Sequence, residues 1–195
     1  MDPRLLRFYT DHIQRFGTHD PRALGWRNDA SQLDRFSVLT EIADLTNASI
    51  LDEGCGFGDL YPFLKSRFSG IQYSAVDINQ TAIATAQERY PEVSFEVADF
   101  SDYTEGPFDY VLSSGALTFN MDNAVPTYQA HMRKMYDLCI KGVAFNVLDR
   151  KAVTQTDEYL GWDPEETEAY CNTFAEKVIV RHDYSLEDFT VYLYR

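Results

Sequence analysis

The stretch ILDEGCGFGDL at residues 50–60 decides the fold, because it joins an apolar strand pattern to a glycine turn and then to a helix pattern. Gly54, Gly56 and Gly58 lie in the turn, where glycine permits positive φ and lets a ligand approach the backbone closely. The helix beyond points its positive N-terminus at whatever occupies the turn. A tight turn without a ligand uses glycine in the same way, so this pattern alone indicates only a candidate binding site.

The acids around this turn separate it from a dinucleotide-binding loop. Such a loop has glycine at its first, third and sixth positions, whereas here the sixth position is Asp59 and the third glycine falls one residue early. Asp52, Glu53 and Asp59 surround a turn that would otherwise receive a pyrophosphate. Their charge favours a cationic or zwitterionic ligand.

Strand and helix patterns alternate from Ser49 onward. The strand patterns are 49–54, 71–77, 93–99, 108–114, 142–148, 177–183 and 189–195, and the helix patterns are 59–68, a helix from an Asn79 cap to Pro91, one from about Pro126 to Cys139, and 164–175. This alternation predicts an α/β fold: a Rossmann-like, doubly wound, seven-stranded sheet, mostly parallel, with helices on both faces. The last two strands are too close for a helical crossover, so we expect a C-terminal antiparallel strand.

The N-terminal part reads as helical. Residues 3–16 place Leu5, Leu6, Tyr9, Ile13 and Phe16 on one face, and a loop follows at 19–29. Asp29 is expected to cap a helix that runs through Leu45, with Leu33, Phe36, Leu39 and Ile42 turned inward.

The overall composition limits the class of protein. The 195 residues, 45% of them apolar, suffice for one domain, which we expect to span 1–195. A net charge of −14 argues against nucleic acid as a partner, and no basic amphipathic stretch suggests a membrane. The three cysteines lack regular spacing and the four histidines are scattered, which predicts a cytoplasmic protein without a metal site. The N-terminus is too polar for a signal peptide.

Two further acids end strand patterns. Asp77 follows Gly58 by 19 residues and can accept hydrogen bonds from the two hydroxyls of a ribose, although it can also cap the next helix. Asp99 can accept from an adenine amine beside the apolar wall of Phe100, or it can be a solvated loop acid next to a core phenylalanine. The small residues SSGA at 113–116 leave room for a ligand.

In these motifs the sequence resembles the class I S-adenosylmethionine-dependent methyltransferases. LDEGCGFG is similar to their first motif, AVD to the second, VADF to the third and FDYVLSSGAL to the fourth, and FTVYLYR to their final antiparallel strand. The resemblance implies S-adenosylmethionine as cofactor and S-adenosylhomocysteine as product. Glu53 departs from the family, which more often has an apolar residue there, and its role stays open.

The resemblance also implies roles for individual residues. Asp52, Gly54 and Gly56 would flank the methionine moiety, Asp77 would hold the ribose, Ile78, Asp99 and Phe100 would contact the adenine, and Ser113 would lie under the methionine and the sulfonium. The segment 1–47 would form a helical lid and acceptor segment before a cofactor-binding core at 48–195.

Within that lid, Tyr9, Trp26 and Arg27 are the candidates, with Tyr9 toward the acceptor. Arg27 can pair bidentately with the cofactor's carboxylate, whereas packing of the two aromatics and a surface ion pair for Arg27 are the alternatives. Asp149, at the end of the fifth strand pattern, lies where a base for the acceptor can sit, and a capping or solvated role is its alternative. The sequence shows no other base.

The function that follows is methyl transfer to a small-molecule acceptor. The acidic chain has no appended recognition domain, and SSGA replaces the N/D-P-P-Y/F signature of many amino methyltransferases, which counts against DNA-adenine and glutamine methylation. Two alternatives keep the cofactor: transfer of another group or cyclisation, and a catalytically silent S-adenosylmethionine-binding regulatory protein.

Overall fold

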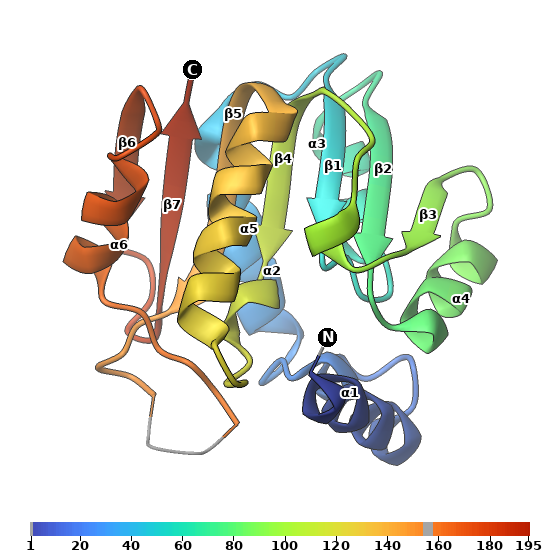
Figure 1. Ribbon diagram of the computed structural model, residues 1–195. Helices are drawn as coiled ribbons and strands as arrows, with labels where there is room; N and C mark the ends of the chain where they lie inside the picture. The colour runs from blue at the N-terminus through green and yellow to red at the C-terminus, as the bar shows by residue number, and fades with distance from the viewer. Residues whose placement is uncertain (1, 154–157) are drawn as a thin grey trace.

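A computed structural model describes residues 2–153 and 158–195, and a twisted sheet forms its centre (Figure 1). The sheet has seven strands in the order β3-β2-β1-β4-β5-β7-β6. Their bounds are β1 Ser49–Glu53, β2 Gln72–Asp77, β3 Ser94–Val97, β4 Phe108–Ser114, β5 Cys139–Leu148, β6 Lys177–Arg181 and β7 Asp188–Tyr194. Strands β3, β2, β1, β4 and β5 pair in parallel, and β7 pairs antiparallel with both β5 and β6. This topology confirms the predicted Rossmann-like sheet and its antiparallel C-terminal strand.

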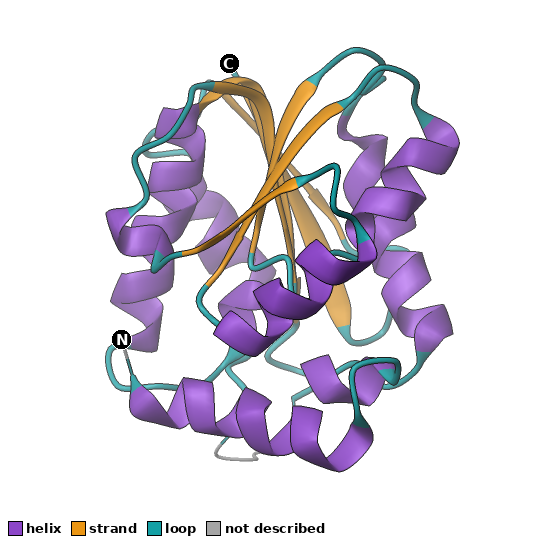
Figure 2. Ribbon diagram, turned by 90° about the vertical axis from the view of Figure 1, so that its right-hand side faces the viewer, coloured by secondary structure: helices purple, strands orange, loops and turns teal. Residues whose placement is uncertain are grey.

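Helices cover both faces of the sheet (Figure 2). α2 (Asp29–Leu39), α3 (Leu60–Arg67) and α4 (Gln80–Arg89) pack on one face, whereas α5 (Ala124–Leu138) and α6 (Pro164–Cys171) pack on the other. Consecutive residues of a strand therefore enter different cores: Leu112 of β4 contacts the first group of helices and Val111 the second. Because both faces of the central strands β1, β4 and β5 are buried, their patterns are apolar runs rather than alternations.

The first helix, α1 (Pro3–Phe16), lies across the carboxyl ends of the parallel strands (Figure 1). Arg4 forms ion pairs with Asp2, the N-cap of α1, and with Asp122 near the start of α5. The ring of Phe8 lies 5.4 Å from that of Phe119, between centroids. α1 is thus attached to the connection between β4 and α5, over the edge of the sheet where α/β proteins bind ligands.

Several expected boundaries in the first half of the chain are wrong. Asn28, not Asp29, caps α2, because its side chain accepts from the Ser31 N–H while Ser31 hydroxyl accepts from the Asn28 N–H, a reciprocal capping box. The α-helix ends at Leu39 and continues as a 3-10 turn over Thr40–Ile42 instead of reaching Leu45. Leu33 is 49% exposed, on the solvent side of α2.

Other boundaries differ toward the C-terminus. Cys139 begins β5 with an extended backbone rather than ending a helix, and α6 stops at Cys171 instead of reaching 175. Cys139 is buried at the start of the strand, so its apolar spacing from Met135 fits a strand start as well as a helix end. The Asn79 cap of α4 is confirmed, since its Oδ1 accepts from the N–H groups of Thr81 and Ala82. No helix within the described residues is long and apolar enough to cross a membrane.

Candidate functional site

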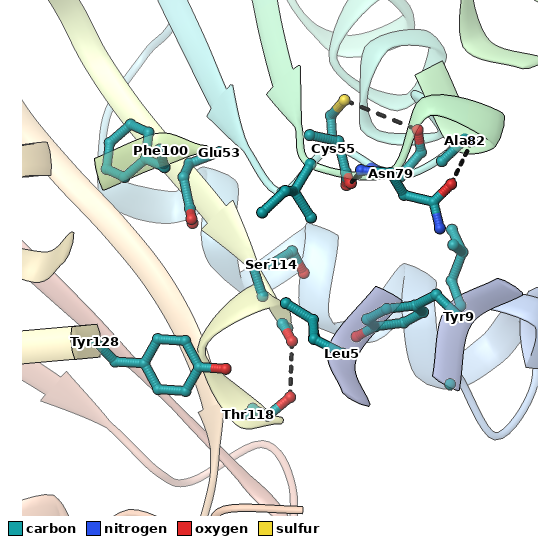
Figure 3. A pocket seen from close by; sticks show the side chains of 18 of the residues that line it. Leu5, Tyr9, Glu53, Cys55, Asn79, Ala82, Phe100, Ser114, Thr118 and Tyr128 are labelled. Atoms are coloured by element: carbon teal, nitrogen blue, oxygen red, sulfur yellow. Dashed lines mark hydrogen bonds between the residues drawn. The ribbon is translucent and has the colours of Figure 1, made fainter. Parts of the chain in front are cut away.

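A cavity of about 1030 Å³ lies at the carboxyl end of the sheet, beneath α1. Its walls come from the turn after β1, the ends of β2, β3 and β4, and helices α1, α2 and α5. Figure 3 shows side chains from these separate elements around one open space, among them Tyr9 from α1, Asn79 from the start of α4 and Tyr128 from α5. This volume is at the upper end of the ~300–1,000 Å³ typical of small-molecule sites.

The glycine turn forms one wall, and β2 holds it in place. Gly54 and Gly56 have φ angles of +72° and +55°, and the N–H groups of Gly54 and Cys55 both donate to the Val76 carbonyl. A Cβ at Gly54 would overlap that of Ala116, so the turn has no room for a side chain. The backbone therefore comes close to the cavity at a position that only glycine can occupy.

Asp77, at the end of β2, faces the cavity and holds the backbone on either side of it, whereas Asn79 rather than Asp77 caps α4. Asp77 Oδ2 accepts from the Gly56 N–H and its Oδ1 from the Asn79 N–H, each at 2.8 Å. Burial raises the pKa of this carboxyl, and these two backbone donors oppose that shift. Because a carboxylate offers about four acceptor positions, two remain for a ligand.

The carboxyl of Asp52 lies deeper in the same wall. Asp52 is buried and accepts a hydrogen bond from the Tyr73 hydroxyl. Burial raises the pKa of Asp52 to about 8, and the negative charge of Glu53 contributes in the same direction. Asp59, the residue that breaks the dinucleotide pattern, forms an ion pair with Arg89 at 3.1 Å. The turn is therefore lined by acids, as the sequence indicates.

The expected adenine contacts lie together at another part of the cavity. Ile78, Asp99 and Phe100 all line it. Asp99 accepts from the Ser101 N–H at 2.9 Å, and the ring of Phe100 packs against that of His131 with centroids 5.2 Å apart.

Two expected site residues are absent from the described cavity lining. Ser113 is fully buried and donates through Oγ to Glu53 Oε2 at 2.5 Å, because strand alternation turns its neighbour Ser114 toward the cavity instead. Asp149 accepts from the Lys151 N–H at 2.8 Å, so it stabilises the turn after β5. It does not cap a helix, because the described residues directly after it form a turn.

The three N-terminal candidates, Tyr9, Trp26 and Arg27, lie in different environments. Tyr9 lines the cavity, and burial raises its pKa, so its hydroxyl keeps its proton. Trp26 also lines the cavity but belongs to the buried core, where its ring packs on Phe36. Arg27 lies at the rim with its side chain 62% exposed and forms an ion pair with Glu187.

Sequence reasoning missed two cavity residues, Arg35 and His131. The side chain of Arg35 is only 14% exposed, stacks over Trp26 at 4.8 Å and forms an ion pair with Asp188. His131 Nδ1 lies 3.3 Å from Glu53 Oε1. No local pattern marks either residue, since each is one polar position on an amphipathic helix.

The fold, the glycine turn and the acid at the end of β2 are similar to those of class I S-adenosylmethionine-dependent methyltransferase domains. Residues 50–142 match the family model described as a methyltransferase domain.

Individual proteins similar to this chain carry the same description. The chain is 38% identical over 81 residues to the magnesium-protoporphyrin O-methyltransferase of Rhodobacter capsulatus, which covers 39% of this chain and 35% of that protein. It is 26% identical over 152 residues to a putative methyltransferase of Mycobacterium tuberculosis, which covers 73% of this chain and 90% of that protein. The chain thus spans about a third of the first relative's length.

Among solved structures, the magnesium protoporphyrin IX methyltransferase of Synechocystis PCC 6803 with bound S-adenosylmethionine superposes with a TM-score of 0.72. The identity is 14%, with 98% of this chain and 95% of that chain covered. This likeness shows that the two chains share their fold.

Proposed function

We propose that this chain binds S-adenosylmethionine in the cavity beneath α1 and transfers its methyl group to a small-molecule acceptor. The observation that carries the proposal is the bond between Asp77 and Gly56, which joins the positive-φ turn to a carboxylate that faces the same cavity. The two remaining acceptor positions of Asp77 suit the two hydroxyls of a ribose.

The residues of the cavity fit the other parts of this cofactor. The acids of the turn suit its ammonium and sulfonium charges. Asn79 is buried, and its Nδ2 has no hydrogen-bond partner among the described residues, so it can donate to a bound ligand. Phe100 and Ile78 offer apolar surface for the adenine, and Asp99 offers an acceptor.

The cofactor's carboxylate needs a cation, and of the three arginines in the described lining, Arg4 is taken up by Asp2 and Asp122. Arg27 is at the exposed rim, whereas Arg35 is buried beside the turn after β4, where a Cβ on Gly115 would stand 3.9 Å from its Nη1. Burial strengthens an ionic contact because less water screens it. We therefore assign the carboxylate to Arg35 rather than to Arg27.

S-adenosylmethionine, when bound, supplies a methyl group that already carries its own leaving group. The protein's contribution is then to align the acceptor with that group and to keep water out. α1 closes the cavity with Leu5 and Tyr9, which point into the open space in Figure 3. The segment up to residue 47 thus serves as lid and acceptor segment of one methyltransferase domain.

A small molecule is the acceptor that this cavity favours. α1 lies over the carboxyl end of the sheet and is linked by the Arg4–Asp122 ion pair to the segment before α5, which narrows the access for a folded macromolecule. The R. capsulatus relative is, by its name, a methyltransferase of a small molecule, magnesium-protoporphyrin.

Calorimetry followed by product analysis tests the proposal. S-adenosylhomocysteine should bind in the micromolar range, about 7–8 kcal/mol, and NAD should not, because Asp59 stands where the pyrophosphate would lie. Incubation with labelled S-adenosylmethionine and a metabolite extract should give S-adenosylhomocysteine and a labelled product. Formation of methylthioadenosine would instead indicate transfer of another group or cyclisation. Binding without turnover would indicate a catalytically silent regulatory protein. NAD binding without any S-adenosyl ligand would overturn the proposal.

A further inference from the structure

Glu53 is a buried carboxylate that faces the cavity from the end of β1. Only 5% of the residue is exposed, and it lines the cavity on the sheet face opposite to Asp52. Figure 3 shows its carboxyl beside Phe100, on the same side of the open space as Tyr128. Its Oε2 accepts from Ser113 Oγ at 2.5 Å, which fixes the orientation of the carboxyl.

His131 connects this carboxylate with the surface. Its Nδ1 lies 3.3 Å from Glu53 Oε1 and has no hydrogen-bond partner within the described residues. Its Nε2 lies 3.1 Å from Ser101 Oγ, and Ser101 is exposed. The three side chains therefore lie in a line from the buried cavity to solvent, with a hydrogen bond between His131 and Ser101 and a 3.3 Å approach, without a hydrogen bond, between His131 and Glu53.

We propose that the methyl acceptor is an amine, that Glu53 receives its N–H group, and that His131 and Ser101 lead the released proton to solvent. This inference rests on the proposed methyl transfer. The ammonium form of the acceptor gives one proton to Glu53. The nitrogen lone pair then forms a bond to the methyl carbon, the carbon–sulfur bond breaks, and its electron pair stays on sulfur, which becomes a neutral thioether.

The charges of the cavity favour an amine over an acid as the acceptor. Eight carboxylate residues line it: Asp2, Asp52, Glu53, Asp59, Asp77, Asp99, Asp122 and Glu187. Of the three arginines of the described lining, Arg4 is ion-paired with Asp2 and Asp122, Arg27 is ion-paired with Glu187, and Arg35 is the one assigned above to the cofactor's carboxylate. An anionic acceptor would meet repulsion without a compensating cation, whereas an ammonium group would be attracted.

The walls near Glu53 are aromatic, which indicates an apolar body on that amine. Phe100, Tyr128 and His131 lie around the carboxyl, and Tyr9 faces them from α1. Rings of this kind also attract a cation over their faces. An arylalkylamine therefore combines the two properties that this part of the cavity selects.

Other charged groups lie around the relay. Asp52 and Asp77 act on Glu53 from the turn and from the end of β2, and Asp99 acts on His131 from the end of β3. Tyr128 faces Glu53 from α5. Lys134, also on α5, donates to the Ser101 carbonyl at 2.6 Å, so a cation lies near the outer end of the relay.

Ligand pairs with the same carbon skeleton test the inference. Phenethylamine and 3-phenylpropionate are titrated into the S-adenosylhomocysteine complex of the wild type, of Glu53→Gln and of Glu88→Gln, a matched change at an exposed position of α4. The wild type and Glu88→Gln should bind the amine and not the acid, and Glu53→Gln should lose at least tenfold in affinity for the amine. Equal binding of the acid, no binding of the amine by the wild type, or full binding by Glu53→Gln each overturns the inference.

His131→Asn separates the relay from packing. This variant should bind phenethylamine within about twofold of the wild type, yet transfer methyl to it about 100-fold more slowly, a typical loss for a missing proton acceptor. An unchanged rate of methyl transfer would overturn the relay.

Binding of S-adenosylhomocysteine is measured on every variant. If the wild type does not bind it, the proposed function fails. If the wild type binds it without preferring the amine, only this inference fails. If Glu53→Gln does not fold, the preference of the wild type between amine and acid still tests the inference.

Discussion

The backbone N–H of Gly56 donates a hydrogen bond to the carboxylate of Asp77 at 2.8 Å. This bond connects the turn after β1 with the end of the neighbouring strand β2. A residue expected to bind a ligand therefore also holds the loop that would receive it, and its substitution acts on both.

Replacement of Asp77 should weaken the binding of any ligand that carries the ribose. For Asp77→Ala we expect a loss of roughly 2–3 kcal/mol, or about 30–150-fold, because charge-assisted hydrogen bonds to two hydroxyls disappear. S-adenosylhomocysteine and adenosine should lose affinity equally in calorimetry, since both contain the ribose. Asp102→Ala, at an exposed acid, is the control. If Asp77→Ala binds both ligands as the wild type does, Asp77 does not hold the ribose.

Variants of Arg35 and Arg27 should differ in their effect on ligand affinity, and the difference should depend on the cofactor's carboxylate. Substitution of Arg35 should weaken S-adenosylhomocysteine by more than tenfold and leave adenosine within about twofold, whereas Arg27→Ala should change neither. The ion pair of Arg35 with Asp188 is buried, so loss of one partner costs about 3–5 kcal/mol of stability. The double variant Arg35→Met, Asp188→Asn removes both charges, and its melting curve is recorded beside the binding data. A larger loss of S-adenosylhomocysteine affinity in Arg27→Ala would show that Arg27, not Arg35, binds the carboxylate.

Gly54 and Gly17 form a matched pair of positive-φ glycines. Their φ angles are +72° and +74°, but a Cβ at Gly54 would overlap Ala116, whereas a Cβ at Gly17 would meet nothing within 4 Å. Alanine at Gly17 should cost about 1–3 kcal/mol through backbone strain alone, because φ 74° with ψ 174° is a region that essentially only glycine adopts. Gly54→Ala should cost clearly more and should also reduce cofactor binding. Denaturant unfolding of both variants measures the difference, and equal costs would show that the turn yields without penalty.

Asp52 should make the stability of the ligand-free protein depend on pH. Its pKa is about 8 when folded and near 3.9 when unfolded, so the folded state binds more protons between these values. The free energy of unfolding should therefore fall as pH rises from about 4 to 8. Burial raises the pKa of Asp59 and Asp77 in the same direction. Asp52→Asn should flatten this slope in urea unfolding at a series of pH values, and an unchanged slope would show that Asp52 is ionised in the folded state.

Much of the cavity wall proposed to bind the cofactor could be predicted from local sequence. The glycines require a turn at 54–58, the apolar runs on either side require buried strands, and Asn79 caps α4 as expected. Parallel strands end at one edge, so Asp77 and Asp99 had to lie near the turn. These features depend on backbone preferences and on periodicity, which a single segment contains.

The part of the cavity proposed for the methyl acceptor, around Glu53 and His131, depends on contacts between segments that are distant in sequence. Whether Glu53 faces His131 is decided by which face of β1 receives α5 and by the rotation of that helix, and neither is encoded in a motif. Trp26 belongs to the core and Arg35 to the cavity because α2 packs on the sheet beside β4 and β5. The sequence by itself determined the fold and the position of the turn, since these follow from local geometry. Only the tertiary structure decided which charges meet in the cavity, because burial and pairing arise when the helices pack.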